Sequence, residues 1–340
     1  MSTQHARQFS RRRFLGGVTL AGTAGLLGVP PGPVAAEPPP ETTTLRLVKI
    51  PSICQAPQYV AEELLKSEGF TEVIDIKKDR DTGIQQALVS GEADLSNNYG
   101  GPLILSVEAG DPVVILAGLH VGCFELVGTD RVRAIRDLKG KTVAVPGLGS
   151  SQHVYLASMV AYVGLDPRTD ITWVPHSLAD AVRLLTEEKI DAFLATPPAA
   201  QELRAKGIGH VVVNSTLDRP WSQYFCCMMA GHRAFVRTHP VAAKRALRAI
   251  LKANQLCALE PERVATFLVE RGFTPNYDYA LQTLRELPYA RWREYDPEDT
   301  IRFYALRLHE AGMIKSTPQK IIAQGTDWRF LNELKKELKG

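Results

Sequence analysis

From residue 44 to the end of the chain, apolar residues recur with the spacing of strands in some segments and of helices in others. Short runs rich in Val, Ile and Leu are typical of strands in a sheet covered on both faces, whereas apolar positions three and four residues apart are typical of helices. Strand and helix patterns follow one another, which predicts an α/β fold with mainly parallel sheets. The predicted strands are residues 45–50, 73–77, 93–95, 112–128, 143–145, 171–174, 190–194, 209–214 and 224–230.

Helical patterns fill the segments between and after these strands. A polar, glycine-rich turn at residues 96–102 is predicted to separate a very short strand from the next helix. The length of 340 residues exceeds the ~250–300 residues at which one core stops growing, so two lobes are expected. The predicted helices are residues 57–67, 82–89, 103–109, 178–187, 240–259, 261–271, 277–287, 297–311 and 327–338.

Residues 142–155 combine a strand, a glycine turn and a helix start. Pro146 and Gly147 end the apolar run, and Gly149 allows a tight turn. Ser150 or Ser151 then stands at the N-cap position, where free amides and the helix dipole favour a negative or electron-rich group. The stretch is therefore either a ligand seat or an ordinary capped helix that binds nothing.

The N-terminal region resembles a twin-arginine export signal. Arg11, Arg12 and Arg13 precede a glycine-rich apolar segment at residues 16–29, shorter than the roughly 20 residues that span a bilayer. Residues 1–36 are predicted to be a signal peptide and residues 37–43 a linker. No lipobox cysteine follows, so we expect a soluble periplasmic protein with the twin-arginine translocase as a partner during export.

Composition excludes little beyond nucleic-acid binding. Charged residues make up 23% and aromatic residues 7% of the chain, and the formal net charge of +3 includes the arginines of the signal. A basic arm for nucleic acid is disfavoured because the arginines stop abruptly and an apolar run follows.

The order of elements resembles the nitrate, taurine and sulfonate type of substrate-binding protein from ABC importers, in the superfamily that includes thiamine-pyrimidine synthases. Four phrases carry the resemblance: Ala-Asp-Leu at 93–95, Asp-Leu-Lys-Gly-Lys at 137–141, Gly-Ser-Ser at 149–151 and Lys-Ile-Asp-Ala at 189–192. It implies a two-lobed type II periplasmic binding-protein fold, with a mainly parallel sheet and flanking helices in each lobe. It also implies permease and ATPase partners, and crossover strands near 126–130 and 225–231. The implied lobes are residues 44–127 with 231–340, and residues 128–230.

The same resemblance places the ligand between the lobes, at the carboxyl ends of strands. The loops expected there supply amides, hydroxyls and aromatic rings but no clear arginine, the residue that usually meets a strongly anionic group. A single oxyanion or a small polar, partly aromatic solute fits: a sulfonate, nitrate, taurine or pyrimidine-like compound. The expected ligand-binding residues are Cys54, Gln55, Asn97, Asn98, Tyr99, His120, Cys123, Ser150, Ser151, Gln152, Thr196, Tyr224 and Cys226.

Cysteines are the unusual feature of these segments, because only Cys257 of the five lies elsewhere, on an apolar helical face. Strand alternation places Cys226 on the face of Tyr224 and Cys227 on the opposite face. Three interpretations stay open: small core residues, a disulfide such as Cys123 with Cys226, or a metal site completed by a histidine. The candidate histidines are His120, His153 and His176.

Two enzymatic relatives are similar in part. Cys54 with Tyr99, Gly100 and Gly101 resembles the nucleophile and supporting turn of aromatic desulfinases, although Asn98 stands where they have arginine. Cys226 and Cys227 lie where thiamine-pyrimidine synthases carry a longer cysteine cluster. Without a base or cation nearby, Cys54 should keep a thiol pKa near ~8.5 and stay mostly inert. We therefore expect a binding protein with no catalytic residue, metal or cofactor.

Overall fold

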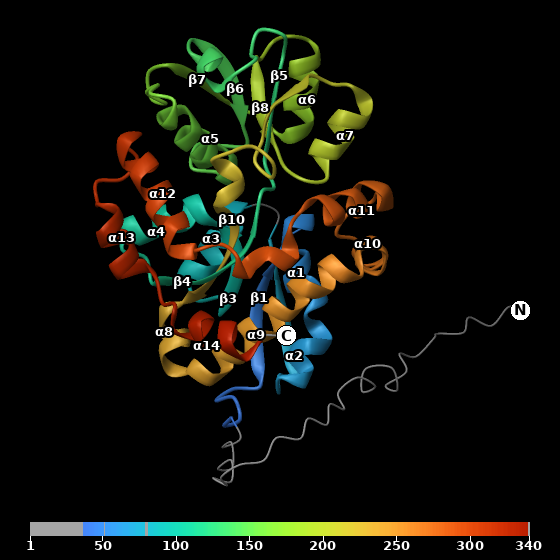
Figure 1. The fold of residues 1–340 in the computed structure, drawn as a ribbon, viewed down its shortest axis with the longest axis vertical. Helices are drawn as coiled ribbons and strands as arrows, with labels where there is room; N and C mark the ends of the chain where they lie inside the picture. Colours follow the sequence, from blue (N-terminus) through green and yellow to red (C-terminus); the bar gives the residue numbers. More distant parts are fainter. Residues whose placement is uncertain (1–36, 51, 79–80, 339–340) are drawn as a thin grey trace, which may run out of the picture. The chain divides into compact units, whose positions relative to one another are not determined.

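The computed structural model describes residues 37–50, 52–78 and 81–338. The predicted signal peptide, residues 1–36, lies outside the described residues. Residues 39–340 form one compact unit that contains two five-stranded sheets (Figure 1). Among the described residues, no helix combines the length and apolar character needed to cross a membrane.

The first sheet has the strand order β2-β1-β3-β10-β4. β1 pairs in parallel with β2 and β3, while β10 pairs antiparallel with β3 and β4. Every residue of β3 and β4 is buried, in keeping with a sheet covered on both faces. The bounds are β1 Thr44–Lys49, β2 Glu72–Lys77, β3 Leu95–Tyr99, β4 Val113–Val121 and β10 Phe225–His232.

The second sheet has the order β7-β6-β8-β5-β9 and repeats this plan. Four strands run in one direction and β5 runs against them. In each sheet the reversed strand is the one that the chain enters on arriving from the other sheet. The bounds are β5 Glu125–Gly128, β6 Lys141–Val145, β7 Ile171–Pro175, β8 Ala192–Ala195 and β9 His210–Asn214. We call each sheet with its covering helices a lobe, and the predicted fold class is confirmed.

The chain crosses between the lobes at residues 122–124 and 215–224, directly before the two reversed strands. The predicted single strand at 112–128 is therefore wrong, since it consists of β4 and β5 with a break between them. Gly122 and Cys123 have left-handed φ values of 88° and 92° at this break. A Cβ on Gly122 would clash with Thr216, so glycine is required where the two crossings lie side by side.

The predicted turn at 96–102 is also wrong. Residues 95–99 form β3 and pair with β10, and α4 (Gly100–Ala109) begins at the next residue. Local turn propensity is overridden because Gln58 and Gln85 satisfy the polar groups of this strand inside the lobe.

Helices cover both sheets, and those after β10 return to the first lobe. The predicted helix at 240–259 is confirmed as α9, α13 was not predicted, and the helix predicted at 57–67 is interrupted at Ala61. α12 contacts α4 of the first lobe and α5 of the second (Figure 1). The helices are α1 Ala56–Val60, α2 Glu62–Ser67, α3 Asp81–Val89, α5 Ser151–Tyr162, α6 Leu178–Thr186, α7 Ala199–Lys206, α8 Arg233–Thr238, α9 Pro240–Leu259, α10 Pro261–Glu270, α11 Tyr277–Glu286, α12 Pro297–Glu310, α13 Pro318–Gly325 and α14 Arg329–Glu337.

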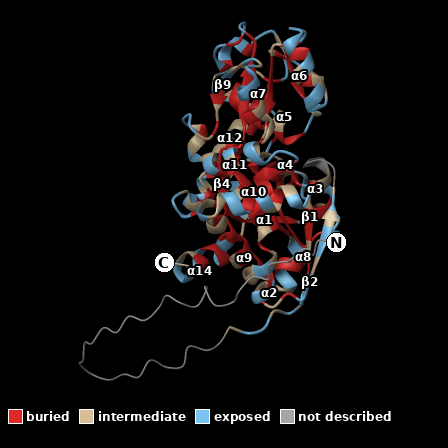
Figure 2. Cartoon of the chain, turned by 90° about the vertical axis from the view of Figure 1, so that its right-hand side faces the viewer, coloured by how far each residue is buried: buried red, intermediate tan, exposed pale blue. Residues whose placement is uncertain are grey.

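The main apolar core continues from the first lobe into α5 of the second. Tyr155 and Met159 of α5 belong to the same buried cluster as Leu103 of α4 and Tyr304 of α12. Figure 2 shows buried residues along both sheets and on the helices where the lobes meet. Where α4, α5 and α12 meet, the two lobes are therefore joined through apolar packing.

Candidate functional site

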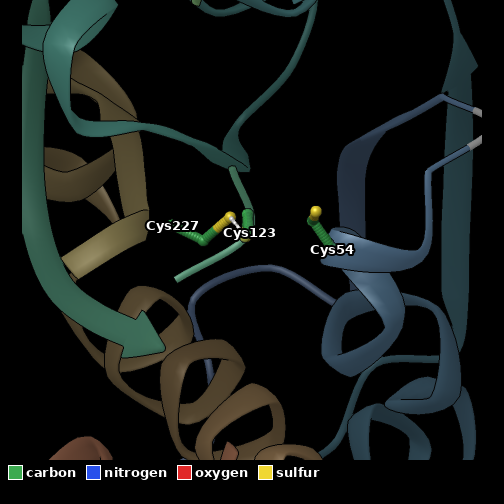
Figure 3. A group of neighbouring side chains, drawn as sticks. All are labelled: Cys54, Cys123 and Cys227. Carbon is green, nitrogen blue, oxygen red and sulfur yellow. Dashed lines mark hydrogen bonds between the residues drawn. The ribbon is translucent and has the colours of Figure 1, made fainter. Parts of the chain in front are cut away.

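Four cysteine thiols gather in the first lobe, and we call Cys54, Cys123, Cys226 and Cys227 the thiol cluster. The sulfur atoms of Cys54, Cys123 and Cys227 all lie within 4.8 Å of one another (Figure 3). The Sγ atoms of Cys123 and Cys227 are 3.7 Å apart, and that of Cys226 lies 4.0 Å from Cys227. All five cysteines are free thiols, so the structure holds no Cys123–Cys226 disulfide. Cys257 is buried in α9, as expected.

An irregular strand allows two consecutive cysteines to join this cluster. The pairing of β10 with β4 shifts register between Phe225 and Cys227, and again between Cys227 and Met228. Regular alternation would place Cys226 and Cys227 on opposite faces, whereas a bulge re-aims a side chain. Cys227 rather than Cys226 is the member of the three-sulfur group. The sequence carries no signal for this bulge.

His120 holds the turn that carries Cys54. Its Nε2 lies 3.0 Å from the carbonyl oxygen of Cys54, and its Nδ1 lies 3.2 Å from that of Val121 and 3.7 Å from the Cys123 sulfur. The ring packs edge-on against Tyr289 of the segment after α11, and the Tyr289 hydroxyl donates to the carbonyl of Ile53. The short helical turn Ile53–Gln55 is thus fixed from two sides.

The four thiols share one buried environment, but their pKa values shift in different directions. Burial opposes ionisation of Cys227, but hydrogen bonds from the neighbouring thiols and the charge of His120 outweigh it and hold the Cys227 pKa well below its usual value. Burial also opposes the charge of His120, whose pKa is nevertheless raised by Cys227. A hydrogen bond with Cys123 lowers the Cys54 pKa, but Cys227 and burial together raise it well above normal. Burial raises the pKa values of Cys123 and Cys226.

The side chain of Asn97 contacts the Cys54 turn of the thiol cluster, whereas the side chain of Asn98 points away from it. The Asn97 side-chain amide donates to the carbonyl of Cys54 (3.3 Å), and Gln55 donates to the Asn97 carbonyl (3.1 Å). The Asn97 Oδ1 is fully buried and has no hydrogen-bond partner among the described residues. Asn98 points the other way and donates to Gln85 of α3 (2.5 Å), because neighbouring strand residues face opposite sides.

Aromatic rings from both lobes form a continuous group beside the cluster. The ring centroids of Tyr99 and Phe124 are 5.4 Å apart, those of Phe124 and Tyr155 4.5 Å, and those of Tyr155 and Tyr304 5.6 Å. Half-buried Tyr224 stacks on Phe303 of α12 at 3.9 Å. Burial raises the pKa of Tyr155, so its hydroxyl stays neutral.

The second lobe contributes the predicted helix start, and we call residues 147–151 the serine turn. Ser150 is the N-cap of α5 and accepts a hydrogen bond from the His153 amide (3.3 Å). Gly149 has a φ of 83°, and its N–H donates to the His153 ring (3.0 Å). Ser151 is buried, and its hydroxyl donates to Gln152 (2.9 Å). The local structure expected for this stretch is confirmed.

The remaining histidines do not join the thiol cluster. Burial lowers the pKa of His153, which packs edge-on against Trp173 and therefore stays neutral at ordinary pH. His176 is half-buried just before α6. The three-sulfur group among the described residues contains no histidine ligand.

Thr196 is half-buried, and its carbonyl accepts from the Ala200 amide at the start of α7.

Sequence reasoning missed the aromatic partners on the returning helices. Tyr304 shares a face of α12 with buried Ile301 and Leu308, a spacing that predicts core packing but not a position beside a site. Tyr289 stands in a short helical turn with no sequence signal of its own. Tyr155 ends the stretch that carries the serine turn, and its position one turn into α5 is the only hint the sequence offers.

A polar contact joins the lobes at another edge. Arg204 of α7 pairs with Glu286 of α11 at 2.7 Å, and Gln201 donates to the same carboxylate at 2.9 Å. Burial raises the pKa of Glu125 in β5, although the charge of Arg204 opposes the shift. These pairs and the Tyr155–Tyr304 contact bring the two lobes together.

Solved structures of periplasmic binding proteins have the same fold as this chain. The nitrate-binding protein NrtA from Synechocystis PCC 6803 is 17% identical, with a TM-score of 0.72 over 88% of this chain and 90% of its own. The aliphatic sulphonate binding protein SsuA from Escherichia coli is 18% identical, with a TM-score of 0.65 over 85% and 94%. The ligand binding component of an ABC-type import system from Staphylococcus aureus, solved with zinc bound, is 13% identical, with a TM-score of 0.69 over 86% and 98%.

A comparison with curated protein sequences finds no significant match. The model of the NMT1-like family matches residues 38–268. This match covers more than half of the chain and includes the serine turn, the thiol cluster and both crossings between the lobes. The chain belongs to the NMT1-like family.

Proposed function

We propose that this chain is a periplasmic substrate-binding protein that captures a small polar or anionic organic solute and delivers it to the permease and ATPase of an ABC importer. One observation carries the proposal: aromatic side chains of both lobes meet, in the continuous group Tyr99, Phe124, Tyr155 and Tyr304. Cys54 follows β1, Tyr99 ends β3, and the serine turn follows β6. Open α/β sheets bind ligands at these carboxyl ends.

The chemistry of these residues favours a ligand with a flat face and few charges. Tyr99, Phe124 and Tyr155 offer aromatic surface, and Ser151 lies at the amide-rich start of α5. The unpartnered Oδ1 of Asn97 is an acceptor whose burial costs about 1–3 kcal/mol unless a donor satisfies it. A pyrimidine-like solute or a compound with a single oxyanion meets these conditions.

Capture proceeds by closure of the two lobes about the crossings at 122–124 and 215–224. The two crossings lie side by side, with Gly122 against Thr216, and such paired connections are where hinge-closing binders bend. The Arg204–Glu286 and Tyr155–Tyr304 contacts then belong to the closed form. Export by the twin-arginine route, directed by residues 1–36, completes the proposal and delivers a folded protein to the periplasm.

The chain is proposed to be a binder rather than a thiol enzyme. The raised pKa of Cys54 keeps its thiol protonated, and the side chain is buried, so it is a poor nucleophile. Cys227 has a lowered pKa but is only 1% exposed, so an organic substrate has no open path to its sulfur. The desulfinase-like use of Cys54 and the synthase-like use of Cys226 and Cys227 are the competing activities.

A ligand screen tests the proposal. The mature protein is heated with nitrate, taurine, alkanesulfonates and pyrimidines, and a true ligand at a hundredfold excess over Kd should stabilise it by about 2.7 kcal/mol. Small-angle scattering with a saturating stabiliser should show compaction of the protein. Mass spectrometry of the incubated mixture should recover the ligand unchanged. A stabiliser that is converted to product would replace the binder with an enzyme.

A further inference from the structure

We propose that Cys54, Cys123 and Cys227 form a binding site for one soft monovalent metal ion, Cu(I). Their three sulfurs lie within 4.8 Å of one another, with 3.7 Å between Cys123 and Cys227 (Figure 3). Metal–thiolate bonds of about 2.3 Å place sulfur ligands about 4 Å apart. Small side-chain movements therefore bring all three into bonding distance. Cys54 borders the proposed solute site as well, but metal binding here does not depend on solute capture.

Each of the three thiols is aimed by its own departure from regular structure. Cys54 lies in a short helical turn that His120 and Tyr289 hold in place. Cys123 has a φ of 92°, a left-handed conformation that is strained for a residue other than glycine. Cys227 lies between two register shifts. Three independent irregularities converging on one point indicate a built site rather than chance packing of small residues.

The donor set favours Cu(I) over harder or four-coordinate ions. Thiolates are soft ligands that select Cu(I) or zinc, and structural zinc sites take four ligands. Among the described residues, the group that satisfies the mutual distance holds three sulfurs and no carboxylate or imidazole. The three cysteines are at most 3% exposed, so water is a poor fourth ligand. Cu(I) accepts three thiolates, which matches this set.

Two neighbours support the site without entering it. Cys226 lies 4.0 Å from Cys227 but outside the three-sulfur group. The ring nitrogens of His120 lie 3.0 and 3.2 Å from backbone carbonyl oxygens, and Nδ1 lies 3.7 Å from the Cys123 sulfur, so the ring orients the Cys54 turn and contacts a ligand without being one of the three sulfurs. Uptake of Cu(I) displaces the thiol protons of the bound cysteines into solvent, with no change of oxidation state.

The test is an anaerobic titration of the reduced, mature protein with Cu(I) against a bicinchoninate competitor. We expect one Cu(I) bound per chain, with Ag(I) as a redox-inert probe giving the same stoichiometry. Loss of a residue that only contacts a metal ligand already costs 10–100-fold in metal affinity, so loss of a ligand itself in C54S or C227S should cost at least about a hundredfold. C226S, which removes a neighbour and not a ligand, should lose about tenfold, clearly less than C54S and C227S. C257S, the matched control in α9, should bind like the unmodified protein.

X-ray absorption of the Cu(I) protein keeps the test decisive if a serine variant fails to fold. Three sulfur ligands and no nitrogen ligand are expected. A four-coordinate site with an imidazole would overturn the assignment, as would equal loss of binding in C257S. Failure to bind Cu(I) while thiol titration counts five free cysteines would also overturn it. A solute found by the ligand screen leaves these outcomes unchanged, so the two proposals fail separately.

Discussion

The thiol cluster and the serine turn occupy equivalent places in the two lobes, yet they are built differently. The Cys54 segment of the cluster follows β1 and the serine turn follows β6, and each of these strands has parallel neighbours on both sides. The serine turn is one continuous stretch whose contacts are local, such as Ser150 with His153. The cluster brings together the segments at 54, 123 and 226–227 through contacts between residues far apart in the chain, such as His120 with Cys54. One architecture thus presents an amide and hydroxyl surface on one lobe and sulfur on the other.

The two regions should differ most in how much the protein is destabilised when a glycine is replaced by alanine. A Cβ at Gly122 would clash with the side chain of Thr216 and lie 3.1 Å from its Cα, in a left-handed conformation. Gly147 of the serine turn has open space around its Cβ direction. Gly122→Ala should lower the free energy of unfolding by about 2–4 kcal/mol through strain and overpacking.

Gly147→Ala is the matched control and should stay within about 0.5 kcal/mol of the unmodified protein. Urea unfolding of both variants measures the difference. Equal stability of the two variants would mean that the crossing at 122–124 adapts freely and does not fix the position of Cys123.

This contrast explains what the sequence predicts and what it does not. The serine turn was predicted because strand, glycine, cap and helix are adjacent in the chain. The sequence shows four cysteines on segments that the structure brings together, but strand alternation favours Cys226, and only the bulge in β10 brings Cys227 beside Cys123. The break after β4 and the contact of Tyr304 with Tyr155 depend on long-range packing. No local pattern encodes such contacts.

Removing the N-cap of α5 should have the next largest effect on the free energy of unfolding. Ser150 accepts from the His153 amide, and loss of a serine cap costs typically about 1 kcal/mol. Ser150→Ala should therefore lower the free energy of unfolding by about 1 kcal/mol, whereas Ser150→Asp should retain a cap. Urea unfolding of the two variants checks this. No loss in the alanine variant would show that the turn is held by Gly149 and His153 without the hydroxyl.

Ser151 separates ligand binding from stability in the same turn. Its hydroxyl is proposed to donate to the solute, and loss of a neutral hydrogen bond costs about 0.5–1.5 kcal/mol. Ser151→Ala should weaken solute binding by that amount in a calorimetric titration.

Cys54→Ser, on the opposite lobe, should leave solute affinity within about tenfold, or 1.4 kcal/mol. A larger loss in Cys54→Ser than in Ser151→Ala would reverse the roles of the two regions.

The smallest effect is a pH dependence that arises at the serine turn. Burial lowers the pKa of His153, and its neutral ring accepts a hydrogen bond from the Gly149 amide. Because the folded pKa lies below the unfolded value of about 6.5, the unfolded chain binds the proton more readily. This contribution to stability is fully present above pH ~6.5 and is lost as the pH falls through the folded pKa. His153→Gln keeps an acceptor and removes the titration, so urea unfolding at pH 7.5 and at lower pH values should show a steeper loss in the unmodified protein than in the variant. An equal loss of unfolding free energy in both proteins would mean that other groups cause the acid sensitivity and that His153 does not contribute.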